Sequence, residues 1–431
     1  MLFNMSPLIA LIPLILYIVF AFKDINPILN VLICVVITAI LTQQPLLSMG
    51  SVIGESLGSF LGLIGFIIML GSALGAILRK TGVAENLVIT VMKKIGINTE
   101  RKAIIATMIT SMLLCALLGT LAGANAIIAP IVIPLVASIG LTPSVLAAVF
   151  MGAGLTGMFI GPFSPQVVTI MELTHLPYGQ YLLSAGIPVT IVCLIVTYIM
   201  ANKIQKNTKG IYMYENIESV NTSNEQSKEV KNATLAFIIT ILVFVIYGIY
   251  SKSGASYAIV VMFISALITG IVAKMPINTI FETLVEGASR MVWLFIMFVL
   301  FTPFITFIEQ SGAFTELVNL LQPLLESGNK IVFSLVSTLT GIFGIGGAAV
   351  AQSVVMDKMF AHIVTSLDIS PGLWAMILLV GSQITSFAYP EADMLGQMGL
   401  ARSKDLKNMV KLGVTVVICT VLLVGIRSIL G

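Results

Sequence analysis

Charged residues, histidine and cysteine are all scarce in this sequence, and each scarcity excludes a class of protein. Only 10% of the 431 residues are charged, whereas charged residues make up about a quarter of an ordinary soluble domain. There are two histidines, and all four cysteines lie inside apolar runs. This inventory supplies neither a metal-ligand set nor a nucleophile with its base, so we expect no enzyme and no cofactor. No basic patch is interleaved with aromatic residues, which excludes nucleic-acid binding.

Apolar residues take the place of the missing charges. The chain is 58% hydrophobic, and uncharged apolar runs of 17 to 22 residues recur along it. A helix needs roughly 20 such residues to cross a hydrocarbon core of about 30 Å. We therefore predict an all-α polytopic membrane protein in the lipid bilayer, with about 10 transmembrane helices and two re-entrant hairpins.

The order of segment lengths repeats between the two halves of the chain. A polar stretch at 203–233 contains both signs of charge and predicts a solvated linker. On either side of it, GMFIGPFSP matches TSFAYPEAD 228 positions later, which pairs Pro162 with Pro390. Three further local matches occur in the same order in both halves, two before this one and one after it. We therefore predict an internal repeat, with residues 1–202 and 234–431 as its two copies.

Loop charges predict that the two copies have opposite orientations. The stretch 79–102 carries six basic residues against two acidic ones, and the linker carries five lysines, so both should be cytoplasmic. The counterpart of 79–102 in the second half carries Glu309, Glu316, Glu326 and one lysine, so it should lie outside. Equivalent segments on opposite sides of the membrane are the mark of an inverted-topology repeat.

Each copy also contains one run that is too short for two spans and one that is too long for a single span. The runs 103–140 and 331–367 leave about 16 residues per arm after a turn, so re-entrant hairpins are favoured over pairs of full spans. The runs 143–172 and 371–396 approach 45 Å as straight helices, and each carries proline about 20 residues in. We expect both to be broken near the middle of the membrane.

The two hairpin turns, LGTLAGANA and FGIGGAAVAQS, interrupt apolar runs with glycine and polar side chains. Backbone that leaves the helix at membrane depth is tolerated where it lines a cavity or is buried in protein. Gly119 and Gly123 could instead serve close helix packing, whereas a buried amide such as Asn125 needs partners. The glycine cluster of the second turn lacks the Lys-Ser/Thr of a nucleotide loop.

Two carboxylates, Glu391 and Asp393, follow Pro390 after a run without charge. Ionisable groups at membrane depth are rare and usually functional, which favours a sodium or proton site. Alternatively, the span ends early and both acids cap a short helix at the cytoplasmic interface. A third alternative is that they pair with an amine group of the substrate. The first copy has Phe163 and Pro165 at the matching positions, so the acids belong to one copy only.

On LAGANAIIAPIVIPL, the GPFSP break and its matching YPEAD, the chain resembles the ion transporter superfamily of inverted-repeat secondary carriers. Among these it is most similar to the anaerobic C4-dicarboxylate, gluconate and citrate carriers, with sodium/proton antiporters in the same wider group. The resemblance implies a multi-pass protein of the prokaryotic cytoplasmic membrane, and many such carriers are homodimers. The chain differs from these carriers because it lacks the Ser-Asn-Thr that the divalent-anion members place at both hairpin tips, and because it carries Glu391 and Asp393. These acids would repel a multiply charged anion unless a cation is bound or they are protonated.

The resemblance also implies that hairpin tips and helix breaks form the substrate and cation sites. The residues expected to bind the substrate are Thr120, Gly123, Asn125, Ser164, Gln166, Gly346, Gly347, Gln352 and Ser386. Those expected to bind the cation, with Na⁺ as the candidate metal, are Gly161, Pro162, Thr385, Glu391 and Asp393.

We therefore predict a secondary active transporter that couples Na⁺ or H⁺ to the movement of a small organic acid or amino acid. The alternative is a sodium/proton antiporter without an organic substrate. A channel would need a continuous polar path, and a primary pump would need a nucleotide-binding domain. The sequence shows neither.

Overall fold

The computed structural model describes residues 6–23, 25–45, 49–214, 226–317, 319, 329–344 and 349–430, and helices account for nearly all regular structure within them. The helices of the first half are η2 (Pro7–Leu11), α1 (Ile12–Phe22), α2 (Pro27–Leu41), α3 (Met49–Ser56), α4 (Phe60–Lys80), α5 (Val83–Ile95), α6 (Glu100–Leu118), α7 (Leu121–Ala137), α8 (Pro143–Ile160), α9 (Pro165–Thr174), α10 (Tyr178–Tyr181), η4 (Leu182–Gly186) and α11 (Ile187–Thr208). Those of the second half are α12 (Lys228–Ser251), α13 (Tyr257–Val272), α14 (Ile277–Ser289), α15 (Val292–Gln310), α17 (Lys330–Ile342), α18 (Ala349–Ser366), α19 (Pro371–Gln383), α20 (Thr385–Ala388), α21 (Ala392–Leu400) and α22 (Leu406–Leu430).

The lengths and hydropathies of these helices confirm an all-helical polytopic membrane protein. Among the described residues, seven helices are long and apolar enough to cross a membrane, and six more apolar helices are shorter. The shorter ones include α7 and α17, which belong to the two runs predicted as hairpins, and α19, which ends where the second long run is interrupted. About 10 crossings with inverted topology remains a prediction.

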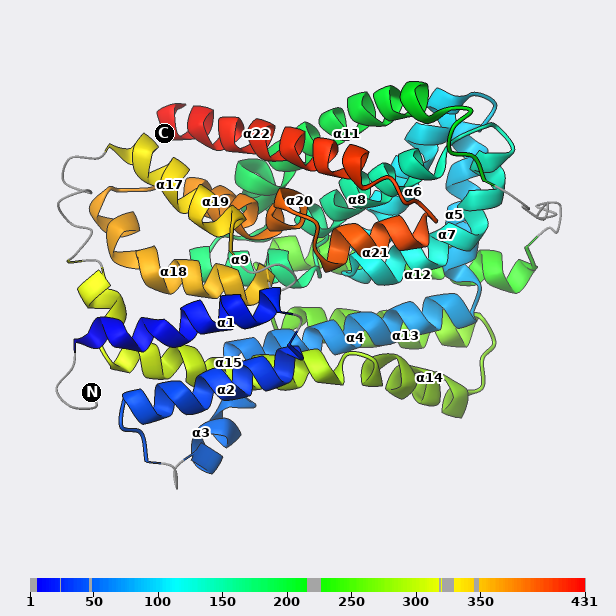
Figure 1. The fold of residues 1–431 in the computed structure, drawn as a ribbon. Helices are drawn as coiled ribbons and strands as arrows, with labels where there is room; N and C mark the ends of the chain where they lie inside the picture. Colours follow the sequence, from blue (N-terminus) through cyan, green and yellow to red (C-terminus); the bar gives the residue numbers. More distant parts are fainter. Residues whose placement is uncertain are drawn as a thin grey trace.

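The helices form two layers (Figure 1). In the lower layer of this view, α4 packs against α13, α14 and α15, and α15 packs against α2. In the upper layer, α8 packs against α6 and α11, α17 packs against α19, and α22 packs against α11 and α17. Helices α2, α4, α13, α14 and α15 therefore share one layer, and helices α6, α8, α11, α17, α19 and α22 share the other.

The upper layer holds the turn between α6 and α7. α6 ends at Leu118, and its C-cap residue Gly119 has a left-handed φ of 64° that a side chain would strain. Thr120 then caps α7, and its Oγ1 accepts a hydrogen bond from the Gly123 N–H at 3.4 Å. The cap satisfies one of the free donors at the helix start, so the chain reverses within two residues.

Both long apolar runs that carry proline are interrupted in the same layer. α8 ends at Ile160 and α9 begins at Pro165, because proline has no N–H to continue the ladder and its ring suits the first helical position. In the second half, α19 and the short α20 end before Pro390, and α21 begins at Ala392. Each interruption creates a new helix start inside the protein.

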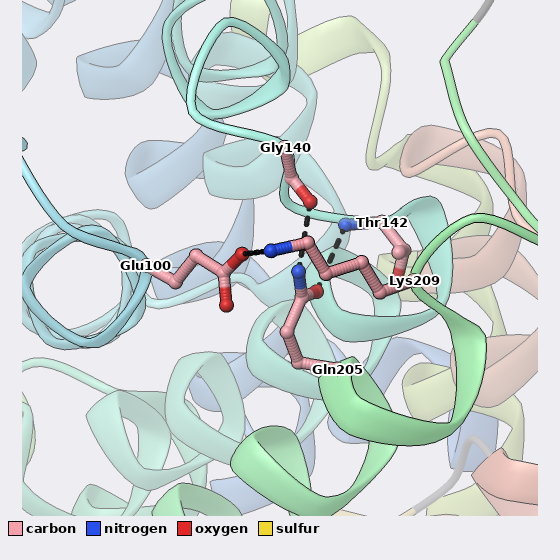
Figure 2. Close-up of polar contacts among 5 residues, drawn as sticks. All are labelled: Glu100, Gly140, Thr142, Gln205 and Lys209. Carbon is pink, nitrogen blue, oxygen red and sulfur yellow. Dashed lines mark hydrogen bonds and ion pairs between the residues drawn. The ribbon is translucent and has the colours of Figure 1, made fainter.

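Helix α11 runs past residue 202, although the sequence predicted that the linker begins at residue 203. α11 continues to Thr208 because its last turn is held by polar contacts (Figure 2). Gln205 Nε2 donates to the Gly140 carbonyl at 2.7 Å, and Gln205 Oε1 accepts from the Thr142 N–H at 3.2 Å. Lys209 forms an ion pair of 2.6 Å with Glu100, which ties this end of α11 to the start of α6.

The chain beyond α11 then lies against the turn between α21 and α22. The Tyr214 hydroxyl donates a hydrogen bond of 3.0 Å to the Ala401 carbonyl. Burial raises the pKa of the Tyr214 phenol well above its ordinary value, and the charge of Arg402 offsets part of that rise. Tyr214 therefore stays a neutral donor that holds this contact at physiological pH.

Candidate functional site

A cavity of about 370 Å³ lies between the two layers of helices. Its lower wall comes from α4, α13, Met291 and the first turns of α15. Its upper wall comes from the α6–α7 turn, the end of α8, the α8–α9 break, the start of α18 and the α19–α21 region. Its polar and charged lining side chains are Ser72, Thr120, Gln166, Ser382, Gln383, Ser386 and Asp393. The lining contains no lysine, arginine or histidine among the described residues, and Asp393 is its one carboxylate.

Three helices begin at this cavity, and each brings unpaired backbone N–H groups to it. They are α7, whose N-cap is Thr120, α9, which starts at Pro165, and α21, which starts at Ala392. The first described residue of α18, Ala349, also lines the cavity. A helix start carries about half a positive charge and attracts anions. The cavity therefore favours a negative group although no cationic side chain lines it.

The start of α9 is the least neutralised of the three. Ser164 stands at its N-cap, but the Ser164 hydroxyl donates to the Met158 carbonyl at 2.7 Å and makes no cap hydrogen bond. The start of α21, by contrast, has Asp393 in its first turn. The positive end of α9 is thus open to a ligand, while a carboxylate of the chain already faces that of α21.

Gln166, in the first turn of α9, joins the two halves of the chain. Its Nε2 donates to Ser353 Oγ at 2.7 Å and to Ser382 Oγ at 2.6 Å, and only 1% of the residue is exposed. Because both donor positions are used, the orientation of the amide is fixed. Its carbonyl Oε1 is buried without a partner among the described residues. An unpaired buried acceptor costs about 1–3 kcal/mol, which a bound donor or cation would offset.

Asp393 and its neighbours form the acidic corner of the cavity. The Ser386 hydroxyl donates to Asp393 Oδ2 at 2.9 Å, and both residues line the cavity. Glu391 stands at the N-cap of α21 outside the lining, with its Oε1 buried and without a partner among the described residues. Two carboxylates two positions apart in a partly buried site repel each other unless a cation or a proton is present.

The end of α8, where Gly161 and Pro162 were expected to bind the cation, is already satisfied by the protein. The carbonyls of Phe159 and Ile160 accept from the Tyr181 and Tyr178 hydroxyls at 2.8 and 2.5 Å. The Gly161 N–H closes the last helical turn onto the Gly157 carbonyl at 2.8 Å. Cation coordination by free carbonyls therefore has little support at this break.

Asn125 is a packing clamp away from the cavity lining. It is fully buried, and its Nδ2 donates to the Phe150 carbonyl at 3.0 Å and to Gln397 Oε1 at 2.7 Å. Its Oδ1 accepts from Ser111 Oγ at 2.6 Å. One amide thus joins α6, α7, α8 and α21, and both of its polar atoms are occupied by protein.

Replacing Asn125 with Leu is therefore expected to lower stability and leave ligand affinity nearly unchanged. The substitution leaves the Phe150 carbonyl and the Ser111 and Gln397 side chains without their partner, at a cost of roughly 2–4 kcal/mol. The midpoint of thermal unfolding in detergent and the ligand affinity of the folded fraction test this directly. A large loss of affinity with unchanged stability would contradict the clamp.

Gln352 and Thr385 form a second set of packing contacts rather than part of the cavity wall. Gln352 Nε2 donates to the carbonyls of Gly341 and Gly381, the latter at 2.7 Å. Thr385 Oγ1 donates toward the same two carbonyls, each at 3.3 Å. A Cβ on Gly341 would lie 2.7 Å from Gly381 Cα, so glycine lets α17 and α19 approach closely here.

The structure thus distributes the predicted site residues over several positions. Four line the cavity: Thr120, Gln166, Ser386 and Asp393. Eight lie outside its lining: Gly123, Asn125, Gly161, Pro162, Ser164, Gln352, Thr385 and Glu391. Gly346 and Gly347 lie outside the described residues. Sequence reasoning did not single out Ser72 or Ser382. Ser382 lies one helical turn before Ser386, so its position could have suggested that both share a face.

Comparison with known protein families settles the family. The model for the tripartite ATP-independent periplasmic transporter, DctM component, matches residues 5–425. The chain belongs to the DctM family. The DctM-family chain is therefore the large membrane subunit of a transporter, and it is not an enzyme. Its family carries out ion-coupled secondary transport of organic acids across the bacterial cytoplasmic membrane, as the sequence predicted for this chain.

Solved structures show the same fold with little sequence similarity. The YdaH transporter of Alcanivorax borkumensis superposes with a TM-score of 0.60 at 15% identity, covering 90% of this chain and 89% of that chain. MtrF of Neisseria gonorrhoeae, described with a class of antimetabolite efflux pumps, gives a TM-score of 0.59 at 13% identity, covering 93% of this chain and 95% of that chain. Comparison with curated proteins finds no match.

These comparisons confirm the ion transporter superfamily and refine the resemblance within it. The family is that of the DctM component rather than that of the C4-dicarboxylate, gluconate or citrate carriers, which the sequence motifs resemble most. They also favour transport of an organic substrate over a sodium/proton antiporter without one.

Proposed function

We propose that this DctM-family chain carries a small organic acid through the cavity between its two layers, with a cation bound beside Asp393. The observation that supports this is the meeting of three helix starts and one carboxylate in a single cavity of about 370 Å³. Such a site offers separate positions for a negative group and a positive one.

The carboxylate of the substrate would bind at the start of α9. Its N-cap side chain leaves the backbone donors there uncapped, and the adjacent Gln166 and Thr120 line the same cavity. Helix starts supply partial charges, and no basic side chain among the described residues that line the cavity adds to them. We therefore propose a substrate with one carboxylate, since a second would meet Asp393 without a fixed cation to balance it.

The coupling cation would bind at the acidic corner, held by Asp393 and the Ser386 hydroxyl. Oxygen ligands suit Na⁺, and a proton could use the same carboxylate. A bound cation would remove the repulsion between Asp393 and an incoming anion, so each ligand would favour binding of the other. This reciprocity provides the coupling that a secondary transporter requires.

Alternating access would follow from movement of the upper layer against the lower one. The cavity lies between the layers, and the predicted inverted repeats place the hairpins and broken helices of both halves in the upper layer. The family description specifies a tripartite, periplasmic system, so we propose that two further components work with this chain.

Ligand-dependent stability of the purified chain tests the proposal without its partner components. Short mono- and dicarboxylic acids, each with and without Na⁺, should be screened by thermal unfolding, since a ligand at 100 times its Kd stabilises by about 2.7 kcal/mol. We expect stabilisation by a monocarboxylate that strengthens with Na⁺. A chain stabilised by Na⁺ alone, and by no acid on the panel, would contradict the organic-acid site.

Replacing Gln166 with Ala should weaken the acid's apparent affinity about tenfold, because the hydrogen bonds from Gln166 to Ser353 and Ser382 that hold the start of α9 at the site are lost. Gln180, which is exposed on α10 and outside the cavity lining, provides the matched control, and Gln180→Ala should bind like the parent. Equal affinities in parent and Gln166→Ala would place the acid elsewhere.

A further inference from the structure

A second concave surface lies on the outside of the helix bundle, away from the transport cavity. It is a groove of about 310 Å³ between α6 and α11, lined by four side chains of α6 and three of α11. All are apolar except for the hydroxyl of Tyr198. Three of them expose a large fraction of their surface, namely Ile105 at 37%, Ile109 at 39% and Ile195 at 54%. Both helices are candidate membrane spans, so the groove faces hydrocarbon.

Basic residues stand on the faces that continue the groove toward one end. On α6, Arg101 lies four positions before Ile105 and eight before Ile109, so all three share a helix face. On α11, Lys206 lies eight positions after Tyr198, which again places it on the groove side. Arg101 and Lys206 are both exposed. Two positive groups therefore stand beyond the same end of an apolar groove.

The ion pair between Glu100 and Lys209 leaves these two charges available. It joins the start of α6 to the end of α11 at 2.6 Å and neutralises two of the charges there (Figure 2). Arg101 and Lys206 take part in none of the ion pairs found among the described residues. The pair brings the two helix ends together and leaves a net positive site above the groove.

The length of the groove matches one leaflet of a bilayer. From Arg101 to Met112, the lining residue of α6 farthest from the basic end, α6 rises about 16 Å at 1.5 Å per residue. Half of a hydrocarbon core of about 30 Å is about 15 Å. The basic residues at 79–102 and after 202 indicate that this end is cytoplasmic, where the leaflet carries anionic lipids.

We propose that this groove binds an anionic phospholipid of the cytoplasmic leaflet. One acyl chain lies between α6 and α11 against Ile105, Ile109 and Ile195, and the phosphate lies between Arg101 and Lys206. A lipid without net charge fills the groove equally well but gains less from two unpaired cations, each worth roughly a factor of five in affinity near a membrane surface. The two positive charges therefore determine which lipid headgroup is preferred, and the groove determines where the acyl chain lies.

A tryptophan in the groove tests the proposal, because brominated acyl chains quench tryptophan fluorescence on contact. Tyr198→Trp places the probe, and the signal of the parent, which contains only Trp293 and Trp374, is subtracted. The full chain is reconstituted in phosphatidylcholine vesicles that contain either brominated phosphatidylglycerol or brominated phosphatidylcholine at equal mole fraction. We expect half-maximal quenching at about a 25-fold lower fraction of the anionic lipid, because two cations each contribute roughly a factor of five.

The controls separate a specific site from general contact with the bilayer. Arg101→Gln with Lys206→Gln should abolish the preference for phosphatidylglycerol. Lys93→Gln with Lys94→Gln removes the same charge from exposed positions at the end of α5 and should keep it. Equal quenching by both lipids, or a preference that survives Arg101→Gln with Lys206→Gln, would show ordinary contact with surrounding lipid and overturn the proposal. Native mass spectrometry of the parent, which should retain phosphatidylglycerol over phosphatidylcholine, gives a readout that needs no variant.

Discussion

Replacing Asp393 with Asn is expected to abolish cation-coupled transport while the protein still folds. Asn has nearly the shape of Asp, and its oxygen can still accept the hydrogen bond that Ser386 donates at 2.9 Å. The negative charge is lost, and Asp393 is the one carboxylate that lines the cavity among the described residues. Removing one partner of a buried charge pair costs roughly 3 kcal/mol or more, which corresponds to about a 100-fold loss of cation affinity.

Two measurements check this expectation. Stabilisation of the purified chain by Na⁺ should shift to about 100-fold higher concentration, and sodium-driven uptake by the complete transporter should fall to background. Asp405→Asn is the matched control, because Asp405 accepts from the Asn408 N–H at 3.2 Å beside the start of α22, away from the cavity. It should behave like the parent. If Asp393→Asn kept its full response to sodium, the cation would have to bind elsewhere.

Much of the fold could be predicted from local features of the sequence. The all-helical membrane architecture follows from apolar runs and scarce charge, because each spanning helix satisfies its own backbone in lipid. Proline acts on the residues beside it, so α9 begins at Pro165 and α21 begins shortly after Pro390. These signals depend on neighbouring residues and can be read without knowledge of the packing.

The roles of individual polar residues depend on partners far away in the sequence. Asn125 and Gln352 both lie beside small-residue turns and were expected to bind substrate, but their amides hold helices together. One partner of Asn125 is Gln397, 272 positions away, and no local pattern identifies it. Ser72 likewise lines the cavity only because α4 of the other layer packs there. Ridge-and-groove packing decides which face of a helix meets the cavity, and sequence spacing alone does not fix it.

Gly157→Ala is expected to destabilise the protein strongly, although alanine favours helices. Gly157 is buried in α8 where that helix crosses α6. A Cβ there would lie 2.3 Å from the Met112 carbonyl oxygen and 2.7 Å from the Ala116 nitrogen. Both atoms belong to the backbone of α6, so neither can rotate away and the helices must separate. Overpacking of this kind costs about 1–3 kcal/mol, and more where backbone is in the way.

Stability is measured as the temperature at which half of the purified protein remains monodisperse on size-exclusion chromatography. Gly396→Ala is the matched control, because Gly396 lies within α21 with no atom within 4 Å of an added Cβ, and the gain in helix propensity should leave stability equal or slightly higher. A small residue is required where two backbones approach and dispensable where the surface is open. If Gly157→Ala were as stable as Gly396→Ala, α6 and α8 would be able to move apart at little cost and so relieve the 2.3 Å contact between the added Cβ and the Met112 carbonyl oxygen. The cavity walls that these helices support would then not be rigid.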